Sequence, residues 1–304
     1  MIRRMKTLLC AVAAVGLVAP LPSMLAASSD RIEQYGVTFT FDRPHDYGTF
    51  ANGDIWILTG DDGKVEITAI TPEFTGQHHG WEVNPQGFRK QGFDTRILHF
   101  DASRVPGLPY SASAGESVVK AISVDPDKKR ARPALKTAVV LTVLAQAPPD
   151  GGKGTFRPPY FADEKPLYAT ADLRPEKLPS VEPRGVGQVP PLEWVERKFR
   201  RVWLDHKINW SGRYMHPTSN MPGFGAGIAR DTGAGALRLM LDDPLEAKMP
   251  ALINYVQLGI DLYHMRKKGM RWPPNGGHMS GRKLPIAFAG ALLENNAMKT
   301  AVSK

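Results

Sequence analysis

Residues 54–70 run Asp54-Ile-Trp-Ile-Leu-Thr-Gly-Asp-Asp-Gly-Lys-Val-Glu-Ile-Thr-Ala-Ile70 and indicate a β-hairpin. Two stretches rich in β-branched and aromatic residues flank the turn signal Gly60-Asp-Asp-Gly63, and the second stretch alternates along its length. Val37-Thr-Phe-Thr-Phe41, which comes earlier, alternates in the same way. Short alternating stretches separated by turn residues are typical of antiparallel sheets.

Three later stretches predict further strands of the same sheet, at residues 96–100, 117–123 and 138–144. Glycine, proline and asparagine lie between them, as they do between the strands of antiparallel proteins. The sequence therefore predicts an N-terminal antiparallel β-sandwich-like domain over residues 30–145.

Residues 146–190 have a different composition and predict a Pro/Gly-rich connector. Ten of the 26 prolines fall between Gln146 and Pro191, and apolar periodicity is low there. The segment keeps the aromatic residues Phe156, Tyr160, Phe161 and Tyr168. We therefore expect it to pack along a domain.

After Pro191 the apolar residues recur at helical spacing, and we expect a helical domain over residues 191–304. The pattern predicts helices that start at Leu192, that span 225–241, that follow Asp243-Pro244 as far as Gly269, and that span 283–298. Helices separated by loops in this way indicate an α/α array.

The N-terminus is typical of a secretory signal peptide, which we expect to cover residues 1–27. Arg3, Arg4 and Lys6 precede a short apolar run, and small residues follow it. The run is too short for a membrane span, which needs about 20 apolar residues. The single cysteine, Cys10, lies inside this segment, so the mature chain has no thiolate nucleophile, disulfide or thiolate metal site. We expect a periplasmic or secreted protein.

The basic charge is concentrated in the C-terminal half. From Pro190 to Lys304 there are 17 Lys and Arg against 9 Asp and Glu, whereas residues 30–189 have 19 against 21. A basic surface favours an anionic partner, and an acidic glycan, an anionic lipid and a nucleic acid all meet that requirement. For an exported chain we expect an acidic polysaccharide, no nucleic acid and no membrane span. No cofactor and no metal site are expected.

The densest polar constellation is Arg271-Trp-Pro-Pro-Asn-Gly-Gly-His-Met-Ser-Gly-Arg-Lys283, between two apolar helices. Trp272 offers a flat face for a sugar ring, and Asn275 and Arg282 offer hydrogen-bond donors. An imidazole side chain ordinarily has a pKa of about 6.5, which suits proton transfer near neutrality, and His278 makes this constellation a candidate for acid–base chemistry. The alternative interpretation is an ordinary helix–helix loop with solvated side chains.

A second polar cluster precedes it, at residues 205–210 and 213–217. It contains Tyr214 and His216, and the helix between the two clusters carries Asn254 and Tyr255. A tyrosine among apolar neighbours on a helix is more often a core residue than a catalytic one.

Residues 256–263, 272–278 and 280–283 resemble α/α-toroid proteins of bacterial glycan metabolism, including polysaccharide lyases. The resemblance covers residues 190–300 and implies a partial α/α-toroid-like domain that cleaves an acidic polysaccharide by β-elimination. In lyases of this type, Asn and Arg hold the uronate carboxylate and a His or Tyr removes the C5 proton. From the constellation at 271–283 we expect Asn275 and Arg282 to hold the carboxylate and His278 to remove the proton. Tyr255 or Tyr214 then protonates the leaving oxygen. The remaining predicted substrate-binding residues are Trp272, Arg271, His216 and Asn254.

Two other functional classes stay open. The chain also fits a non-catalytic glycan-binding or envelope-associated protein, or a glycoside hydrolase whose paired carboxylates need no fixed spacing. A Gly-x-Ser-x-Gly elbow, a phosphate-binding loop and a zincin motif are all missing from the sequence. The pair His78-His79 is interpreted as a surface pair, because no further ligand follows at metal-binding spacing.

Overall fold

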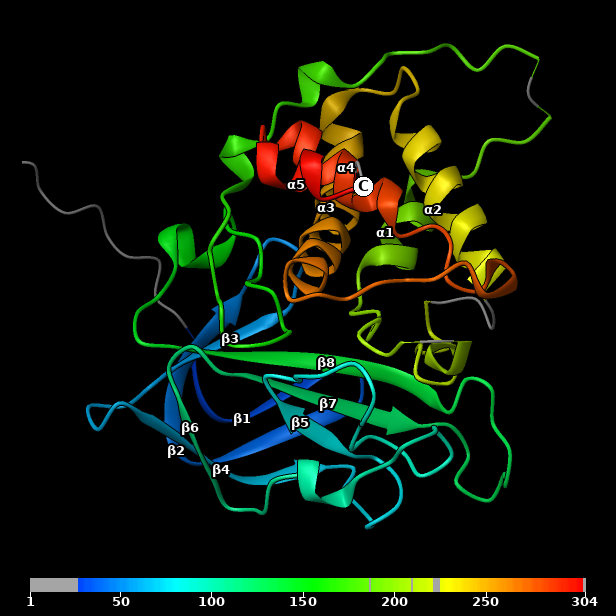
Figure 1. The fold of residues 1–304 in the computed structure, drawn as a ribbon. Helices are drawn as coiled ribbons and strands as arrows, with labels where there is room; N and C mark the ends of the chain where they lie inside the picture. Colours follow the sequence, from blue (N-terminus) through cyan, green and yellow to red (C-terminus); the bar gives the residue numbers. More distant parts are fainter. Residues whose placement is uncertain (1–26, 186, 209, 221–224, 303–304) are drawn as a thin grey trace, which may run out of the picture.

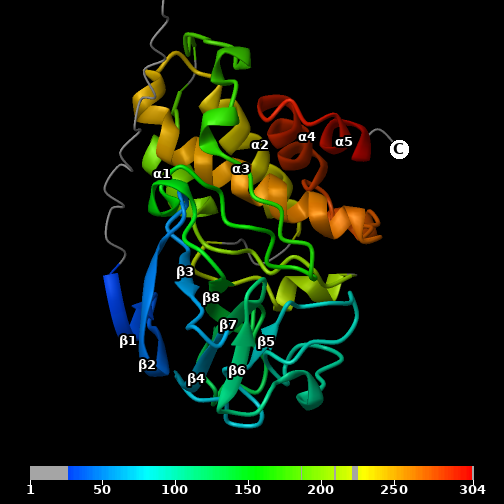
Figure 2. The same ribbon diagram turned by 90° about the vertical axis from the view of Figure 1, so that its left-hand side faces the viewer.

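The computed structural model describes residues 27–302, apart from residues 186, 209 and 221–224. One curled β-sheet forms the N-terminal half and a group of helices forms the C-terminal half, with the connector between them (Figures 1 and 2). The predicted signal peptide falls outside the described residues, except for Ala27. No helix in the described ranges is long and apolar enough to cross a membrane.

Eight strands form the sheet. They are β1 (Ala27–Gln34), β2 (Val37–Thr49), β3 (Ile55–Leu58), β4 (Lys64–Thr71), β5 (Trp81–Val83), β6 (Tyr110–Ser113), β7 (Ser117–Ser123) and β8 (Leu135–Leu144). The strand order is β5-β7-β8-β3-β2-β4-β6, and β1 pairs with β2. All neighbours are antiparallel except β3 and β8, which are parallel.

The predicted hairpin at residues 54–70 is wrong in its pairing, although its turn is correct. Gly60 donates to the Lys64 carbonyl and Gly63 donates to the Gly60 carbonyl, so the chain does reverse there. The 13-residue strand β2 lies between the two arms, because its C-terminal end pairs with β3 and its N-terminal part pairs with β4. Local alternation identifies strands but does not identify their partners.

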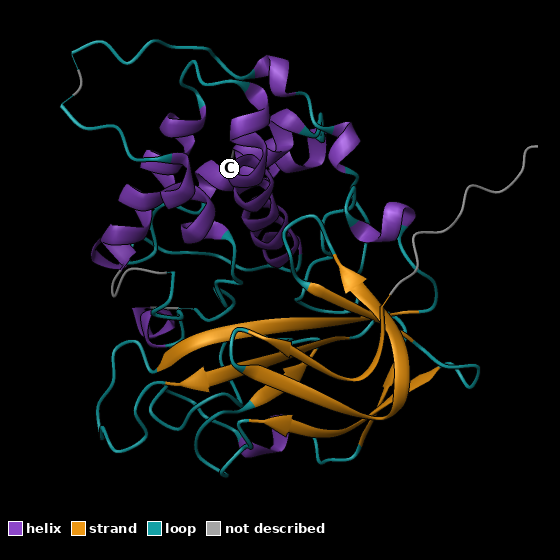
Figure 3. Ribbon diagram, turned by 180° about the vertical axis from the view of Figure 1, so that it is seen from behind, coloured by secondary structure: helices purple, strands orange, loops and turns teal. Residues whose placement is uncertain are grey.

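The predicted β-sandwich is also wrong, because the described strands form a single mixed sheet curled into a half-barrel (Figure 3). The sheet encloses its own apolar core, which includes Phe39, Ile57, Ile67 and Leu141. A second sheet is not needed when one sheet curls over its own inner face. Residues 96–100, predicted as a strand, form turns instead.

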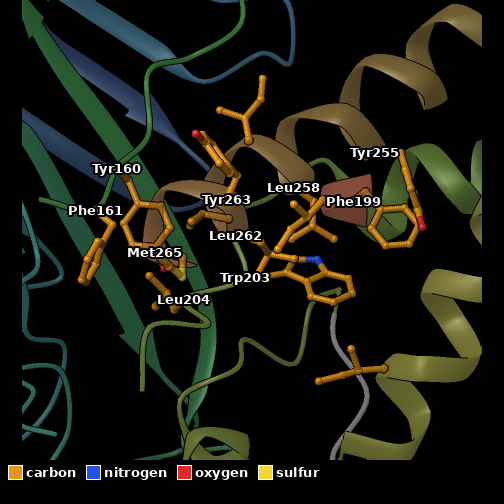
Figure 4. Packing of buried hydrophobic residues seen from close by; sticks show 14 of the residues in the cluster. Tyr160, Phe161, Phe199, Trp203, Leu204, Tyr255, Leu258, Leu262, Tyr263 and Met265 are labelled. Carbon is orange, nitrogen blue, oxygen red and sulfur yellow. The ribbon is translucent and has the colours of Figure 1, made fainter. Parts of the chain in front are cut away.

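β8 carries the sheet into the helical half. Val139, Leu141 and Val143 face the core inside the sheet, whereas Ala138 and Val140 belong to the larger core shared with the helices. A strand buried on both faces has a nearly continuous apolar sequence, as residues 138–144 do apart from Thr142. The outer face of the sheet and the helices therefore share a second hydrophobic core, and Figure 4 shows part of its helical side.

The helices are α1 (Leu192–Phe199), α2 (Gly225–Leu239), α3 (Leu245–Lys267), α4 (Lys283–Leu292) and α5 (Asn296–Ala301). The predicted helix 283–298 is two helices, because Glu294 adopts a positive φ of 52° and Asn295 caps α5 by accepting from the Met298 amide. Pro250 lies inside α3, and the helix continues past it.

The predicted partial α/α toroid is wrong. In the part of the chain that the structure describes, α3 packs against α1, α2, α4 and α5, so the helices surround one central helix instead of forming a ring of pairs (Figure 1). Most of α3 from Ala251 to Met265 is buried, and a helix buried on all sides needs neighbours all round.

A buried ion-pair network joins the sheet, the connector and α3. Arg157 of the connector donates from Nε to Asp54 Oδ2 and from Nη2 to Asp261 Oδ2, both at 2.5 Å, and all three side chains are almost completely buried. Phe156 and Tyr160 beside it are also in the core. The expectation that the connector packs along a domain is confirmed.

Candidate functional site

A cavity of about 680 Å³ lies where the loop between α3 and α4 meets the ends of those helices and of α5. We call it the Trp272 pocket. Its walls are mainly apolar, formed by Trp272, Pro273, Pro274, Met279, Leu284 and Ile286, with Ala301 and Val302 at the end of the described chain. The charged residues among those that line it are all cationic: Arg266, Arg271, Arg282 and Lys283.

Buried anchors and a close backbone contact shape the loop at residues 270–282, which is orange in Figure 1. Met270 and Met279 are both buried in the shared core. Gly281 has a φ of +94°, and a Cβ there would lie 2.6 Å from the Cα of Ala229. Only glycine allows this loop to lie so close to α2.

Arg282 is 2% exposed, and its guanidinium is held by protein groups. Nε and Nη2 donate to the two carboxylate oxygens of Asp205 at 2.6 and 2.9 Å. Nη1 donates to the carbonyls of His278 at 3.2 Å and Ser280 at 2.8 Å. This arrangement fixes the loop against Asp205, so the primary role of Arg282 is to position the pocket wall.

His216 completes the group behind the pocket wall, with its Nε2 lying 2.9 Å from Asp205 Oδ1. Burial on its own raises the pKa of the Asp205 carboxyl, but the charge of Arg282 and the hydrogen bond from His216 outweigh it and hold that pKa well below its usual range. Burial lowers the pKa of His216, so its imidazole is neutral near pH 7. Asp205 is therefore a buried anion that neutralises Arg282.

Three of the predicted residues line the Trp272 pocket. They are Arg271, which is exposed, Trp272, which is half-buried, and Arg282. His278 lies on the same loop and is half-buried, but it is not among the lining residues. The side chain of Asn275 lies outside what the structure describes.

The other predicted residues lie elsewhere in the core. Tyr255 is completely buried and donates its hydroxyl to the Thr232 carbonyl at 2.8 Å, and burial raises its pKa well above the usual value. Tyr214 is 8% exposed, with the Arg132 guanidinium 4.9 Å from its ring centroid. Asn254 is buried and donates to the Pro250 carbonyl. None of these side chains lines the pocket.

The sequence pattern identified the polar loop at 271–283 but did not identify Asp205 as the residue that holds this loop in place. Asp205 follows the buried residues Val202, Trp203 and Leu204. A carboxylate next to such a run requires a buried cationic partner, and that signal could have linked Asp205 to an arginine. Arg266 was missed because it belongs to the basic end of α3, which favours cations in any helix.

The sheet half has a second cationic cavity, of about 460 Å³, lined in part by Phe88, Arg89, Lys90 and Arg104. Arg104 donates to Glu82 Oε2 at 3.0 Å, and Lys90 donates to Asp101 at 2.9 Å. Two of its three cations are therefore already paired with carboxylates. This cavity is the competing site for an anionic ligand.

His78 and His79 are both partly buried, so they do not form the predicted surface pair. His78 Nδ1 lies 3.2 Å from Asp94 Oδ2, and His79 Nδ1 accepts from the Ser123 amide. The described residues contain no group of three His, Cys, Asp or Glu that could hold a metal ion.

Comparison of this chain with protein-family models, with curated proteins and with solved structures finds no match. The geometry of the Trp272 pocket is therefore what indicates a function for this chain.

Proposed function

We propose that this chain is an exported protein that binds an acidic glycan in the Trp272 pocket without cleaving it. The observation that carries the proposal is the combination of a half-buried indole with cationic lining residues in a cavity of about 680 Å³. No acidic residue is among the lining residues that the structure describes. A cavity with one sign of charge favours ligands of the opposite sign.

The chemistry of the lining fits a uronate sugar. The face of a sugar ring carries C–H groups that pack on an indole, and Pro273 and Pro274 extend that apolar surface beside Trp272. The exposed side chains of Arg271 and Lys283 provide charge-assisted hydrogen bonds to a carboxylate. Arg282 supports this surface through Asp205 instead of approaching the ligand as a free cation.

Binding is favoured over cleavage because the candidate acids are not at the pocket. A general acid must lie within hydrogen-bond reach of the atom that it protonates. The Tyr255 hydroxyl is committed to a backbone carbonyl, and Tyr214 does not line the cavity. β-Elimination with His278 as the base stays a prediction, and the following experiment tests it as well.

The test is retention of the purified protein on immobilised polygalacturonate and on immobilised dextran, with unsaturated products and new reducing ends measured in parallel. We expect retention on polygalacturonate alone and no product. Equal passage through both columns contradicts the proposal, and product formation contradicts its non-catalytic part.

Replacing Trp272 with alanine should weaken binding of a galacturonate oligosaccharide roughly 10- to 100-fold, because burying a large apolar side chain contributes about 1.5–3 kcal/mol. Isothermal titration calorimetry measures the change. The control is Trp194→Ala, which removes a half-buried indole of α1 that does not line the pocket. An equal loss in both variants assigns the effect to folding instead of binding.

Replacing Arg271 and Lys283 together with alanine should reduce the dependence of affinity on salt, because two screened charge contacts are removed. Affinity measured between low and physiological ionic strength gives this slope. The matched variant Lys129→Ala/Arg130→Ala removes the same two charges from an exposed loop of the sheet half. If both variants flatten the slope alike, the net charge of the protein attracts the glycan and the pocket does not.

A further inference from the structure

The Trp272 pocket has a larger apolar wall than an unsubstituted sugar can use. Met279 and Ile286 are buried, and Leu284 lines the cavity while 39% exposed. Among the lining residues that the structure describes, Ser280 is the one with a hydroxyl or amide side chain, and its hydroxyl donates to the Gly277 carbonyl at 2.6 Å. Sugar hydroxyls buried against this wall would lose hydrogen bonds to water and gain few in return.

The cations and the apolar wall continue into each other along the chain. Lys283 and Leu284 are consecutive residues at the start of α4, and Arg271 adjoins Trp272. Arg271, Lys283 and Leu284 are all exposed, so both kinds of surface can be reached from solvent. A ligand that uses the whole cavity therefore has an anionic part and an apolar part within the same molecule.

We propose that the pocket binds an amphipathic acid, a uronate sugar that carries an alkyl or acyl substituent. The proposal rests on the proposed function for its sugar and carboxylate, and adds the substituent. The carboxylate pairs with Arg271 and Lys283, and the substituent packs on Met279, Leu284 and Ile286. A cavity of about 680 Å³ is within the usual size range of pockets that enclose a ligand of this kind.

The test compares methyl glucuronide, octyl glucuronide and octyl glucoside by calorimetry, below the concentrations at which the octyl compounds form micelles. Each buried methylene strengthens binding about fourfold, so three buried methylenes give roughly a 60-fold gain for octyl over methyl glucuronide. Octyl glucoside should bind more weakly than octyl glucuronide, because it has no carboxylate to pair with Arg271 and Lys283.

A matched pair of leucine variants locates the substituent. Leu284→Gln should lower the ratio of the octyl glucuronide affinity to the methyl glucuronide affinity roughly tenfold, the contribution of one or two methylenes. Leu237→Gln is the control, since Leu237 is 66% exposed on α2 and does not line the cavity. Circular dichroism confirms that both variants fold.

Two results would overturn the inference in distinguishable ways. If octyl and methyl glucuronide bind equally and Leu284→Gln changes nothing, the apolar part is wrong, while retention on polygalacturonate can still hold. If octyl glucoside binds as tightly as octyl glucuronide and polygalacturonate is not retained, the acidic part is wrong together with the proposed function.

Discussion

Replacing Arg157 with methionine should lower the free energy of unfolding by about 3–5 kcal/mol, because it leaves two buried carboxylates without their cation. Asp54 precedes β3 and Asp261 lies on α3, so removing the Arg157 guanidinium removes an ion-pair link between the sheet and the helices. Urea unfolding followed by circular dichroism measures the change. We also expect the two halves to unfold less cooperatively in this variant.

Two controls distinguish a specific loss from a general one. Lys267→Met removes an exposed partner of Glu164 and should have a far smaller effect, since surface ion pairs contribute little. Introducing Arg157→Met into an Asp54→Asn/Asp261→Asn background should also cost much less, because the buried charges are already gone. If Arg157→Met costs the same in both backgrounds, the network is not what joins the two halves.

Below pH 6.5, stability should decrease with falling pH by roughly 1.4 kcal/mol per pH unit for His206 alone. Burial, followed by the charges of Arg104 and Lys207, lowers the pKa of His206 to about 3. The pKa of this imidazole in the unfolded chain is the ordinary value of about 6.5. Between pH 6.5 and pH 3 the unfolded chain therefore binds a proton that the folded chain does not, so acid favours unfolding. The Tyr160 hydroxyl lies 2.9 Å from Nδ1 of this ring.

Urea midpoints at pH 7, 6 and 5 give this slope. His206→Gln should reduce the slope by about 1.4 kcal/mol per pH unit, the contribution of one proton, even if it lowers stability at pH 7. His99→Asn controls for the loss of an imidazole, because His99 is exposed and asparagine tolerates its φ of 60°. An unchanged slope in His206→Gln contradicts the assignment to His206.

Much of the secondary structure could be predicted from local patterns. The strands at 117–123 and 138–144 and the helices that start at Leu192 and follow Pro244 are present as expected. Their arrangement could not be predicted, because pairing depends on distant residues. β2 separates β3 from β4, and α3 is surrounded by helices that the sequence places on both sides of it.

The candidate site, like the fold, could be predicted only in part from the sequence. The loop at 270–282 was identified because an indole, glycines and cations lie close together in the sequence. The buried run before Asp205 signals that this carboxylate needs an arginine, but it does not show which one, because Arg282 is 77 residues away. Tyr255 was a candidate acid on residue type alone, and only its burial shows that its hydroxyl is committed elsewhere.

Amide hydrogen exchange with and without a galacturonate oligosaccharide shows whether the Trp272 pocket is the binding site. We predict slower exchange at residues 271–284, with residues 86–90 of the second cationic cavity unchanged. Slower exchange at residues 86–90, with residues 271–284 unchanged, would contradict binding in the Trp272 pocket and place the ligand in the second cationic cavity.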